Sequence, residues 1–215
     1  GAGLTMPKRL FDLVFAALGL VLLTPLLLAV ALWVVCDSPG PALFRQQRVG
    51  RAGKLFHIYK FRTMHQRAAA HGPAITIGAD ARITRAGYWL RRTKADELPQ
   101  LVNVLLGQMS LVGPRPEVPH YVALYPCDLR ELILSVRPGI TDHASIEFRD
   151  ESTLLGQSSD PERTYIEEIL PVKLRYAAQY ARSHTLWADL KIIARTISAL
   201  WDYHPPGGRG PSGSA

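Results

Sequence analysis

The stretch LVFAALGLVLLTPLLLAVALWVV, residues 13–35, decides the fold of this 215-residue chain, because it is long, apolar and free of charge. Its 23 residues exceed the roughly 20 that a helix needs to cross the core of a bilayer. That length argues against a secretory signal, as does the lack of a small-residue cleavage site before Ser38-Pro39. A buried core helix is the alternative, and the basic residues before the run favour a membrane helix instead.

Both flanks of this stretch are basic. Lys8 and Arg9 precede it, and Arg45, Arg48, Arg51 and Lys54 follow closely. Because positive charge collects on the cytoplasmic side of a membrane, a simple span would put one cluster on the wrong side. Thr24-Pro25 lies at the middle of the run, where proline kinks a helix, and the Thr24 hydroxyl is a candidate partner for the freed carbonyl. We therefore expect a re-entrant helix that enters and leaves by the same face.

The remainder of the chain predicts a mainly helical α+β fold with a small β-hairpin. Alternating apolar and polar residues around a Gly50…Gly53 turn predict the hairpin at 42–64, and a loop is expected at 65–82. Helical patterning covers 84–106 with an interruption at Pro99. The later segments are expected to be helices at 117–125, 128–136 and 161–170, another helix after Pro171, a strand at 140–148 and a polar loop at 149–160.

The last helical segment, 186–201, has one apolar face. It either packs in the core or lies in the membrane interface, where tryptophan is favourable, and the sequence leaves both open. The face consists of Leu186, Leu190, Ile193, Ile197 and Leu200, with Trp187 and Trp201 beside it. The expected organisation is a membrane helix at 8–37, a cytoplasmic catalytic domain at 38–203 and a disordered Pro/Gly/Ser-rich tail at 204–215.

Charge and cysteine content narrow the classes of function. The chain has 25 Lys and Arg against 18 Asp and Glu, a net charge of +7, which favours a phosphorylated ligand, nucleic acid or an acidic lipid surface. Cys36 and Cys127 are the only cysteines, which excludes a disulfide framework. The seven histidines show no His-x-x-x-His spacing, which argues against a zinc site.

The densest group of reactive residues is Asp96-Glu97, which follows Arg91 and precedes Pro99. Adjacent carboxylates in a basic setting suit phosphoryl chemistry, because one can hold Mg²⁺ or attack phosphorus while arginines neutralise phosphate oxygens. Taken alone, this group also fits a solvated helix start, where acidic residues favour the helix dipole.

Two further motifs present an arginine beside a tight turn. Arg115 stands between Pro114 and Pro116, which would hold its guanidinium ready for an oxyanion, and Arg137 precedes Pro138-Gly139. The charges of Lys60 and Arg62 add to the positive electrostatic potential expected at the site. Each motif, taken singly, also fits a plain rigid turn.

Together and in this order, the motifs resemble those of the bacterial monotopic phosphoglycosyl transferases. The resemblance runs from about Lys8 to about Trp201. The chain is similar to the small members of the family, which consist of a minimal catalytic domain. It rests on the basic flank, the Pro-kinked apolar run, Lys60-Phe61-Arg62-Thr63-Met64, Asp96-Glu97-Leu98-Pro99-Gln100, Val112-Gly113-Pro114-Arg115-Pro116 and Arg137-Pro138-Gly139-Ile140-Thr141. These motifs, found together in the family's order, are far more specific than any one of them.

The resemblance implies a role for each matching residue. Asp96 matches the nucleophile that attacks the sugar-linked phosphate of a UDP-sugar, and Mg²⁺ is expected beside it. Glu97 matches the second member of the dyad, which helps to activate the polyprenyl phosphate acceptor. Arg115 matches an arginine that contacts phosphate. Thr24-Pro25 stands where the family usually has Ser-Pro, and Lys94-Ala95 replaces the more usual Ser-Leu, a departure that bears on donor choice.

The implied protein is a transferase in the bacterial inner membrane, monotopic, with its catalytic domain on the cytoplasmic face. Its partners would be a UDP-sugar, undecaprenyl phosphate and membrane lipids, with no nucleic acid, and a homodimer stays open. A second hypothesis is a membrane-anchored basic protein that binds acidic lipid or nucleic acid. It accounts for the charge and the apolar run but gives Asp96-Glu97 and Arg115 no purpose. The identity of the sugar does not follow from the sequence.

Overall fold

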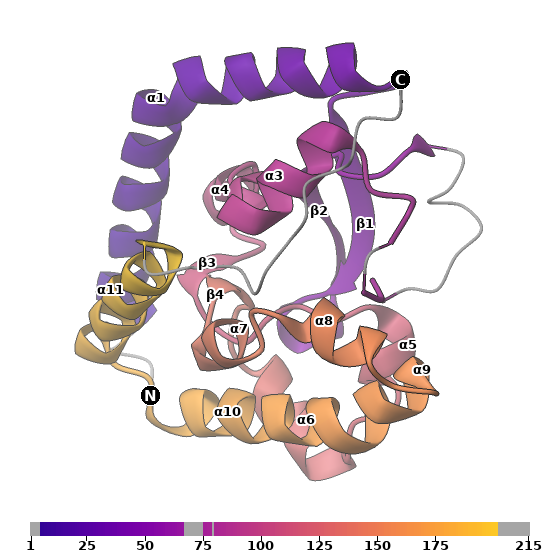
Figure 1. The fold of residues 1–215 in the computed structure, drawn as a ribbon. Helices are drawn as coiled ribbons and strands as arrows, with labels where there is room; N and C mark the ends of the chain where they lie inside the picture. Colours follow the sequence, from indigo (N-terminus) through magenta and orange to yellow (C-terminus); the bar gives the residue numbers. More distant parts are fainter. Residues whose placement is uncertain (1–4, 67–74, 79, 202–215) are drawn as a thin grey trace.

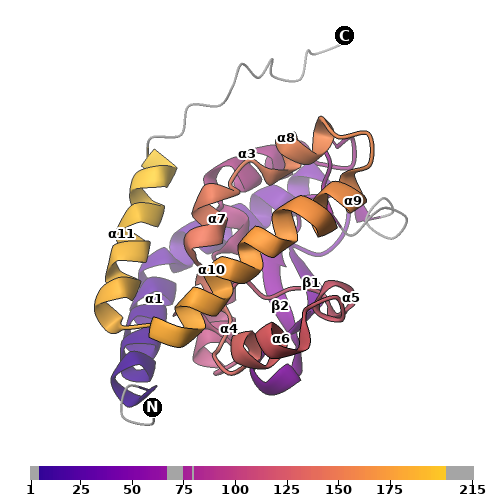
Figure 2. The same cartoon turned by 90° about the horizontal axis from the view of Figure 1, so that it is seen from below.

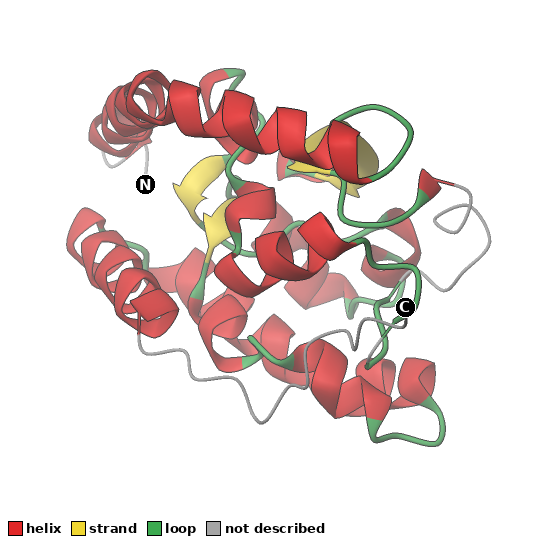
Figure 3. Cartoon of the chain, turned by 45° about the horizontal axis from the view of Figure 1, so that its top comes forward, coloured by secondary structure: helices red, strands yellow, loops and turns green. Residues whose placement is uncertain are grey.

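The computed structural model describes residues 5–66, 75–78 and 80–201, and helices dominate it (Figure 3). Half of the expected loop at 65–82 and the whole tail at 204–215 therefore lie outside the described residues. The strands form two small sheets, an antiparallel pair β1–β2 and a parallel pair β3–β4. The helices are α1 Thr5–Asp37, α3 Arg85–Thr93, α4 Gln100–Leu105, α5 Pro119–Val122, α6 Cys127–Leu134, α7 His143–Glu147, α8 Glu151–Gly156, α9 Pro161–Thr164, α10 Leu170–Ser183 and α11 Leu186–Trp201. This agrees with the mainly helical α+β class expected from the sequence.

Helix α1 is the long apolar helix predicted from the sequence. Within the described ranges, Met6–Asp37 is the one segment long and apolar enough to cross a membrane. The helix contains Pro25 and bends sharply along its length, so that its two halves run in different directions (Figure 1). The Thr24 hydroxyl donates to the Leu20 carbonyl at 2.6 Å. The hydroxyl therefore does not bond the Val21 carbonyl, which Pro25 leaves without its usual N–H donor. A threonine hydroxyl that bonds the carbonyl four residues earlier, as Thr24 does, itself tends to bend a helix.

The two halves of α1 pack on different parts of the chain. The first half buries Ala16 against Leu101 and Val104 of α4, while the second half buries Val30 and Val34 against α3. Helix α11 lies beside the beginning of α1 in two views (Figures 1 and 2). The bent helix therefore runs along one side of the molecule and over its top.

The end of α1 is tied to two neighbouring elements. Arg62 donates to the carbonyls of Val34 at 3.2 Å and Ser38 at 2.6 Å, and also contacts the Pro39 carbonyl. The carboxylate of Asp37 accepts the Ala86 N–H at 3.0 Å, at the first turn of α3. These contacts satisfy carbonyls and N–H groups that helix ends leave open.

The predicted hairpin is confirmed. Strand β1, Leu43–Val49, pairs antiparallel with β2, Leu55–Phe61, in a register that places Leu43 opposite Phe61. The single 3₁₀ turn η1, Arg51–Gly53, connects them, and Gly53 has a φ of +74°, a backbone conformation that favours glycine. The hairpin presents Lys60 near the end of β2.

The predicted helix over 84–106 is broken earlier than expected. Helix α3 ends at Thr93, Lys94 takes a left-handed conformation with a φ of 58°, and a 3₁₀ turn η2, Ala95–Glu97, precedes α4. Pro99 does not break the helix, because it stands just before the first residue of α4, where a missing N–H costs nothing. The turn η2 places Asp96 and Glu97 outside any regular α-helix.

The strand predicted at 140–148 is confirmed only for Ile140 and Thr141. Strand β4, Gly139–Thr141, is short, and α7 follows because the Asp142 side chain accepts the Ser145 N–H at 2.7 Å as an N-cap. Strand β3, Ser110–Val112, pairs parallel to β4 and was not expected. The segment 149–160, expected to be a loop, contains α8.

Three other helical predictions need only new boundaries. The helices expected at 117–125 and 128–136 are the shorter α5 and α6. The helix after Pro161 continues as α9, a π-helical turn η3, Tyr165–Ile169, and α10, without a break at Pro171. Pro171 is tolerated because it lies in the first turn of α10, directly after the π turn.

Helix α11 shows its apolar face to the outside. Ile192 is buried, whereas Trp187, Ile197 and Trp201 are 65%, 60% and 86% exposed. Ile192 packs with Tyr180 and Val112 in a small cluster, while a larger core cluster lies between α5, α6, α8 and α10, around Tyr121, Leu155, Tyr165, Ile169 and Leu174. Most of the apolar face of α11 is therefore free of the core.

Candidate active site

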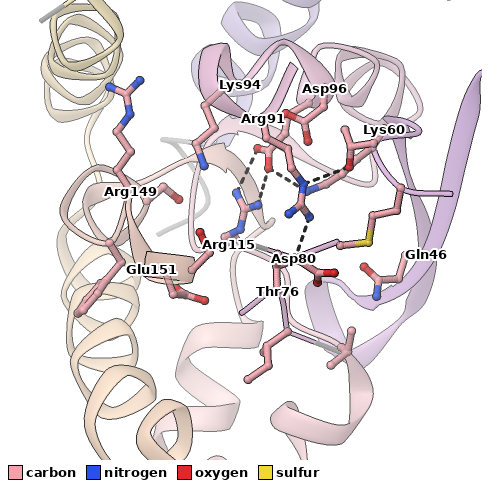
Figure 4. A pocket seen from close by; sticks show the side chains of 18 of the residues that line it. Gln46, Lys60, Thr76, Asp80, Arg91, Lys94, Asp96, Arg115, Arg149 and Glu151 are labelled. Atoms are coloured by element: carbon pink, nitrogen blue, oxygen red, sulfur yellow. Dashed lines mark hydrogen bonds and ion pairs between the residues drawn. The ribbon is translucent and has the colours of Figure 1, made fainter. Parts of the chain in front are cut away.

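An ionic cluster centres on Glu97. Its carboxylate accepts two hydrogen bonds from Arg115, at 2.5 Å to Oε1 and 3.1 Å to Oε2, and one from Lys60 at 2.8 Å (Figure 4). Burial alone would raise the pKa of Glu97, but the charges of Arg115 and Lys60 outweigh it and hold this pKa well below its usual value. Glu97 is therefore ionised and firmly held.

Asp96 differs from its neighbour. It is 7% exposed, and its Oδ1 is buried with no hydrogen-bond partner among the described residues. Burial raises the pKa of Asp96, and the charge of Lys60 opposes that rise only in part. A buried carboxylate oxygen without a partner is costly unless a ligand or ion meets it. Asp96 therefore has the free oxygen that a nucleophile or metal ligand needs.

Further cations surround the pair. Arg91 donates to the hydroxyls of Thr63 at 3.1 Å and Thr76 at 2.9 Å, and Lys94 extends toward the same space (Figure 4). Burial lowers the pKa of Lys60, Arg91 and Lys94, because the charged forms lose solvent there. An incoming anion would restore the lost stabilisation, so the group is suited to phosphate.

These side chains line one cleft of about 1630 Å³. The hairpin and α3 form one wall, and α7, α8 and α10 form the other, with Arg48, Arg149, Glu151 and Lys173 among the lining residues. The volume exceeds that of most small-ligand sites, which are on the order of 300–1,000 Å³. The cleft can therefore hold a large phosphorylated molecule, or parts of two.

The backbone around Arg115 is closely supported. A Cβ on Gly113 would lie 2.5 Å from the Arg137 carbonyl, so only glycine fits where the chain leaves β3. The Arg115 N–H donates to Asp142 at 3.2 Å, and Asp142 also caps α7. The Arg115 side chain is 30% exposed and so remains open to the cleft.

The structure brings together five of the residues predicted for the site: Lys60, Arg91, Asp96, Glu97 and Arg115. Arg62 borders the same cleft, but its guanidinium is engaged by the carbonyls at the end of α1. Arg137 lies outside the cleft lining and donates to the Gly107 carbonyl at 3.0 Å. Sequence reasoning missed Asp142 and the contribution of Lys94. The available signal for Asp142 was its residue type, because aspartate is a favoured N-cap and Asp142 directly precedes α7.

The basic flank before the apolar run is also engaged within the protein. Lys8 pairs with Asp189 of α11 at 2.5 Å, and Arg9 donates to the Leu105 carbonyl at 3.3 Å. Thr24 and Pro25 lie in α1, away from the cleft lining. These four residues therefore belong to α1 and to its attachment to the rest of the chain.

No preassembled metal cage exists in the part of the chain that the structure describes, where no three His, Cys, Asp or Glu side chains gather. Mg²⁺ does not require one, because it commonly binds one or two carboxylates, several waters and substrate phosphates. The unpartnered oxygen of Asp96 fits that mode of binding.

Comparison with known families identifies the chain. Residues 4–202 match the bacterial sugar transferase family. The chain belongs to that family. The family predicted from the sequence motifs is thus confirmed, and with it the class of enzyme, a transferase.

Relatives of this chain carry closely related names. It is 42% identical over 197 residues to a UDP-glucose:undecaprenyl-phosphate glucose-1-phosphate transferase of Caulobacter vibrioides, covering 90% of this chain and 69% of the relative. It is 36% identical over 195 residues to a UDP-N-acetylgalactosamine-undecaprenyl-phosphate N-acetylgalactosaminephosphotransferase of Aeromonas hydrophila, covering 90% of this chain. The chain spans only 43% of the Aeromonas relative and 39% of a UDP-glucose:undecaprenyl-phosphate glucose-1-phosphate transferase of Escherichia coli.

Proposed function

We propose that this sugar transferase moves a sugar 1-phosphate from a UDP-sugar to undecaprenyl phosphate and releases UMP. One observation carries the proposal. Asp96 keeps a buried oxygen without a partner, directly beside a carboxylate held by two cations, in a cleft lined with further cations. Relatives that cover most of this chain are named for transfers of this kind.

In the first step, an Asp96 carboxylate oxygen attacks the sugar-linked phosphorus of the donor. A bond forms between that oxygen and phosphorus, and the bond from phosphorus to the bridging oxygen breaks, so that UMP leaves with the electron pair. The result is a phosphosugar bound to Asp96. Arg91, Lys94 and Lys60 are suited to hold the phosphate oxygens, because charge neutralisation by fixed cations is the main contribution a protein makes to this chemistry.

In the second step, a phosphate oxygen of the lipid acceptor attacks the same phosphorus. The bond to Asp96 breaks, the carboxylate returns, and the lipid carries a diphosphate-linked sugar. Glu97 assists by fixing Arg115 and Lys60 where the acceptor phosphate arrives. Its low pKa argues for this electrostatic role and against proton removal, since a base with so low a pKa binds a proton weakly.

Mg²⁺ is the expected cofactor, and Asp96 is the residue that would hold it. When bound, the ion would neutralise charge on the donor's phosphates. Asp96 attacks the donor, and Lys60 and Arg91 orient it.

The acceptor is a lipid, so the cleft has to lie at head-group depth. We infer that α1 is re-entrant, that α11 rests in the interface through Trp187 and Trp201, and that the catalytic part faces the cytoplasm at the bacterial inner membrane. The bend in α1 and the exposed apolar face of α11 support this placement. The first membrane step of a surface polysaccharide or other glycoconjugate would use such a reaction.

Intact-mass spectrometry of the enzyme mixed with UDP-sugars, without acceptor, tests the function. We expect an adduct with the mass of a sugar phosphate and release of UMP, both abolished in Asp96→Asn. Asp128→Asn, an equal change on α6 outside the cleft lining, is the matched control and should behave as wild type. Activity retained in Asp96→Asn would overturn the covalent mechanism. Tight binding to acidic liposomes or nucleic acid with no UMP release from any UDP-sugar would favour the binding-protein hypothesis.

A further inference from the structure

A carboxylate on the membrane helix is buried against the catalytic part of the chain. Asp12 of α1 is 2% exposed, although the apolar run begins directly after it. Its Oδ2 accepts the Ser110 hydroxyl at 2.8 Å, and its Oδ1 accepts the Leu111 N–H at 3.1 Å. Both donors belong to β3, so a residue of the membrane helix binds the strand by two hydrogen bonds.

This contact completes the hydrogen bonding of a very short strand. Strand β3 has three residues and one neighbouring strand, β4. The Ser110 N–H donates to the Pro138 carbonyl and the Gly113 N–H to the Thr141 carbonyl, whereas the Leu111 N–H points to Asp12. Asp12 therefore takes the place of a second neighbouring strand. A buried N–H without a partner would be costly, so this carboxylate fixes the free edge of β3.

Another buried contact holds the same strand from the side of α10. The Tyr180 hydroxyl lies 2.9 Å from the Val112 carbonyl and 2.9 Å from Asp189, a residue of α11 that is fully buried. Lys8, one turn before Asp12 on α1, pairs with Asp189 at 2.5 Å. The start of α1, α10 and α11 thus enclose β3.

A displacement of β3 would pass directly to Arg115. Only Gly113 and Pro114 separate β3 from Arg115, and Pro116 follows it. Proline restricts the backbone on both sides, and the Arg137 carbonyl leaves no room for a side chain at Gly113, so the connection has little freedom to absorb a shift. The paired hydrogen bonds from Arg115 to Glu97 also require a defined orientation of the guanidinium.

We propose that Asp12 is a positioning residue for the transfer reaction: it holds β3 so that Arg115 faces Glu97 and the phosphate at the cleft. The inference rests on the proposed function for its catalytic consequence, and on the two hydrogen bonds for its structural part. It gives the first turns of the membrane helix a role in catalysis that is separate from anchoring.

A double-mutant cycle tests the catalytic part. Asp12→Asn has the same shape but loses the charge. The free energies of a charged and a neutral hydrogen bond differ by an amount that corresponds to a factor of about ten, so kcat should fall about ten-fold, with little change in KM for the donor. In an Arg115→Lys background, the same change should lower kcat less than about two-fold, because residues that act through one group are not additive. Asp160→Asn is the matched control. Asp160 caps α9 by accepting the Arg163 N–H at 3.1 Å, but it does not line the cleft.

Hydrogen exchange tests the structural part without relying on activity. In Asp12→Asn the Leu111 amide should exchange faster, while the Ser110 amide, which is bonded to the Pro138 carbonyl, should keep its protection. Unchanged exchange at Leu111 would refute the contact. Faster exchange together with fully additive losses of kcat would refute positioning through Arg115. Wild-type enzyme without any transferase activity would reject the proposed function and leave the exchange result to judge the contact alone.

Discussion

Replacing Arg115 by lysine keeps the charge but removes the paired contact with Glu97. Arginine donates to both carboxylate oxygens, at 2.5 and 3.1 Å, and a lysine ammonium in that place can keep only one of these bonds. A hydrogen bond to a charged group contributes about 1.5–3 kcal/mol, and the lower value is expected here because the Arg115 side chain is 30% exposed. Since about 1.4 kcal/mol corresponds to a factor of ten, kcat/KM should fall roughly ten-fold or somewhat more.

Steady-state release of UMP, with donor and acceptor varied separately, measures this effect. Arg163→Lys is the matched control, because Arg163 contacts both oxygens of Glu167 at 3.0 Å on the surface, where the two side chains are 70% and 57% exposed. Exposed pairs contribute little, so this control should keep wild-type kinetics. Wild-type kinetics in Arg115→Lys would show that the guanidinium only shapes a turn. An equal loss in both variants would point to a general effect of replacing arginine.

Three further predictions concern pH, topology and the interface. Burial raises the pKa of Asp96 above its ordinary value, and attack needs the ionised carboxylate, so kcat/KM should fall as pH drops through this raised pKa. Glu97→Gln removes a neighbouring negative charge and should move the midpoint of the pH–rate profile to lower pH. A move to higher pH would contradict this prediction. Pro25→Leu should straighten α1 toward a full span and reduce activity. The changed topology would be detected by labelling a cysteine at the N-terminus from the periplasm. Labelling identical to wild type would count against the re-entrant interpretation. Trp187→Ser and Trp201→Ser should weaken sedimentation with liposomes, unlike Leu124→Ser, an exposed apolar residue outside α11.

The sequence was most informative where one signal acts over a short range. The apolar run predicted α1, and the alternation around Gly50 and Gly53 predicted the hairpin with its turn. The residues Asp96, Glu97 and Arg115 were recognised because their motifs are contiguous. These features depend on neighbours in the chain, which a sequence displays directly.

Features that depend on distant partners were not predictable in this way. Strand β3 has three residues, too few to show a period, and its binding residue Asp12 is about a hundred positions away. The pattern at 140–148 looked like a strand, but the Asp142 cap decides for a helix. Arg62 carried the charge expected of a phosphate ligand, while the carbonyls that engage it come from the end of α1.

The attachment of α1 at both ends means that this helix is not a removable anchor. Asp12 contacts β3 near its beginning, and the Val34 and Ser38 carbonyls contact Arg62 near its end. A truncation that starts after the helix would remove Asp12, the acceptor for Ser110 and Leu111, and the Val34 carbonyl that Arg62 contacts, and would expose α3 and α4. Replacement by an unrelated membrane helix would have the same fault. A substitution at a contact residue of α1 would therefore need a matching change in β3 or at Arg62.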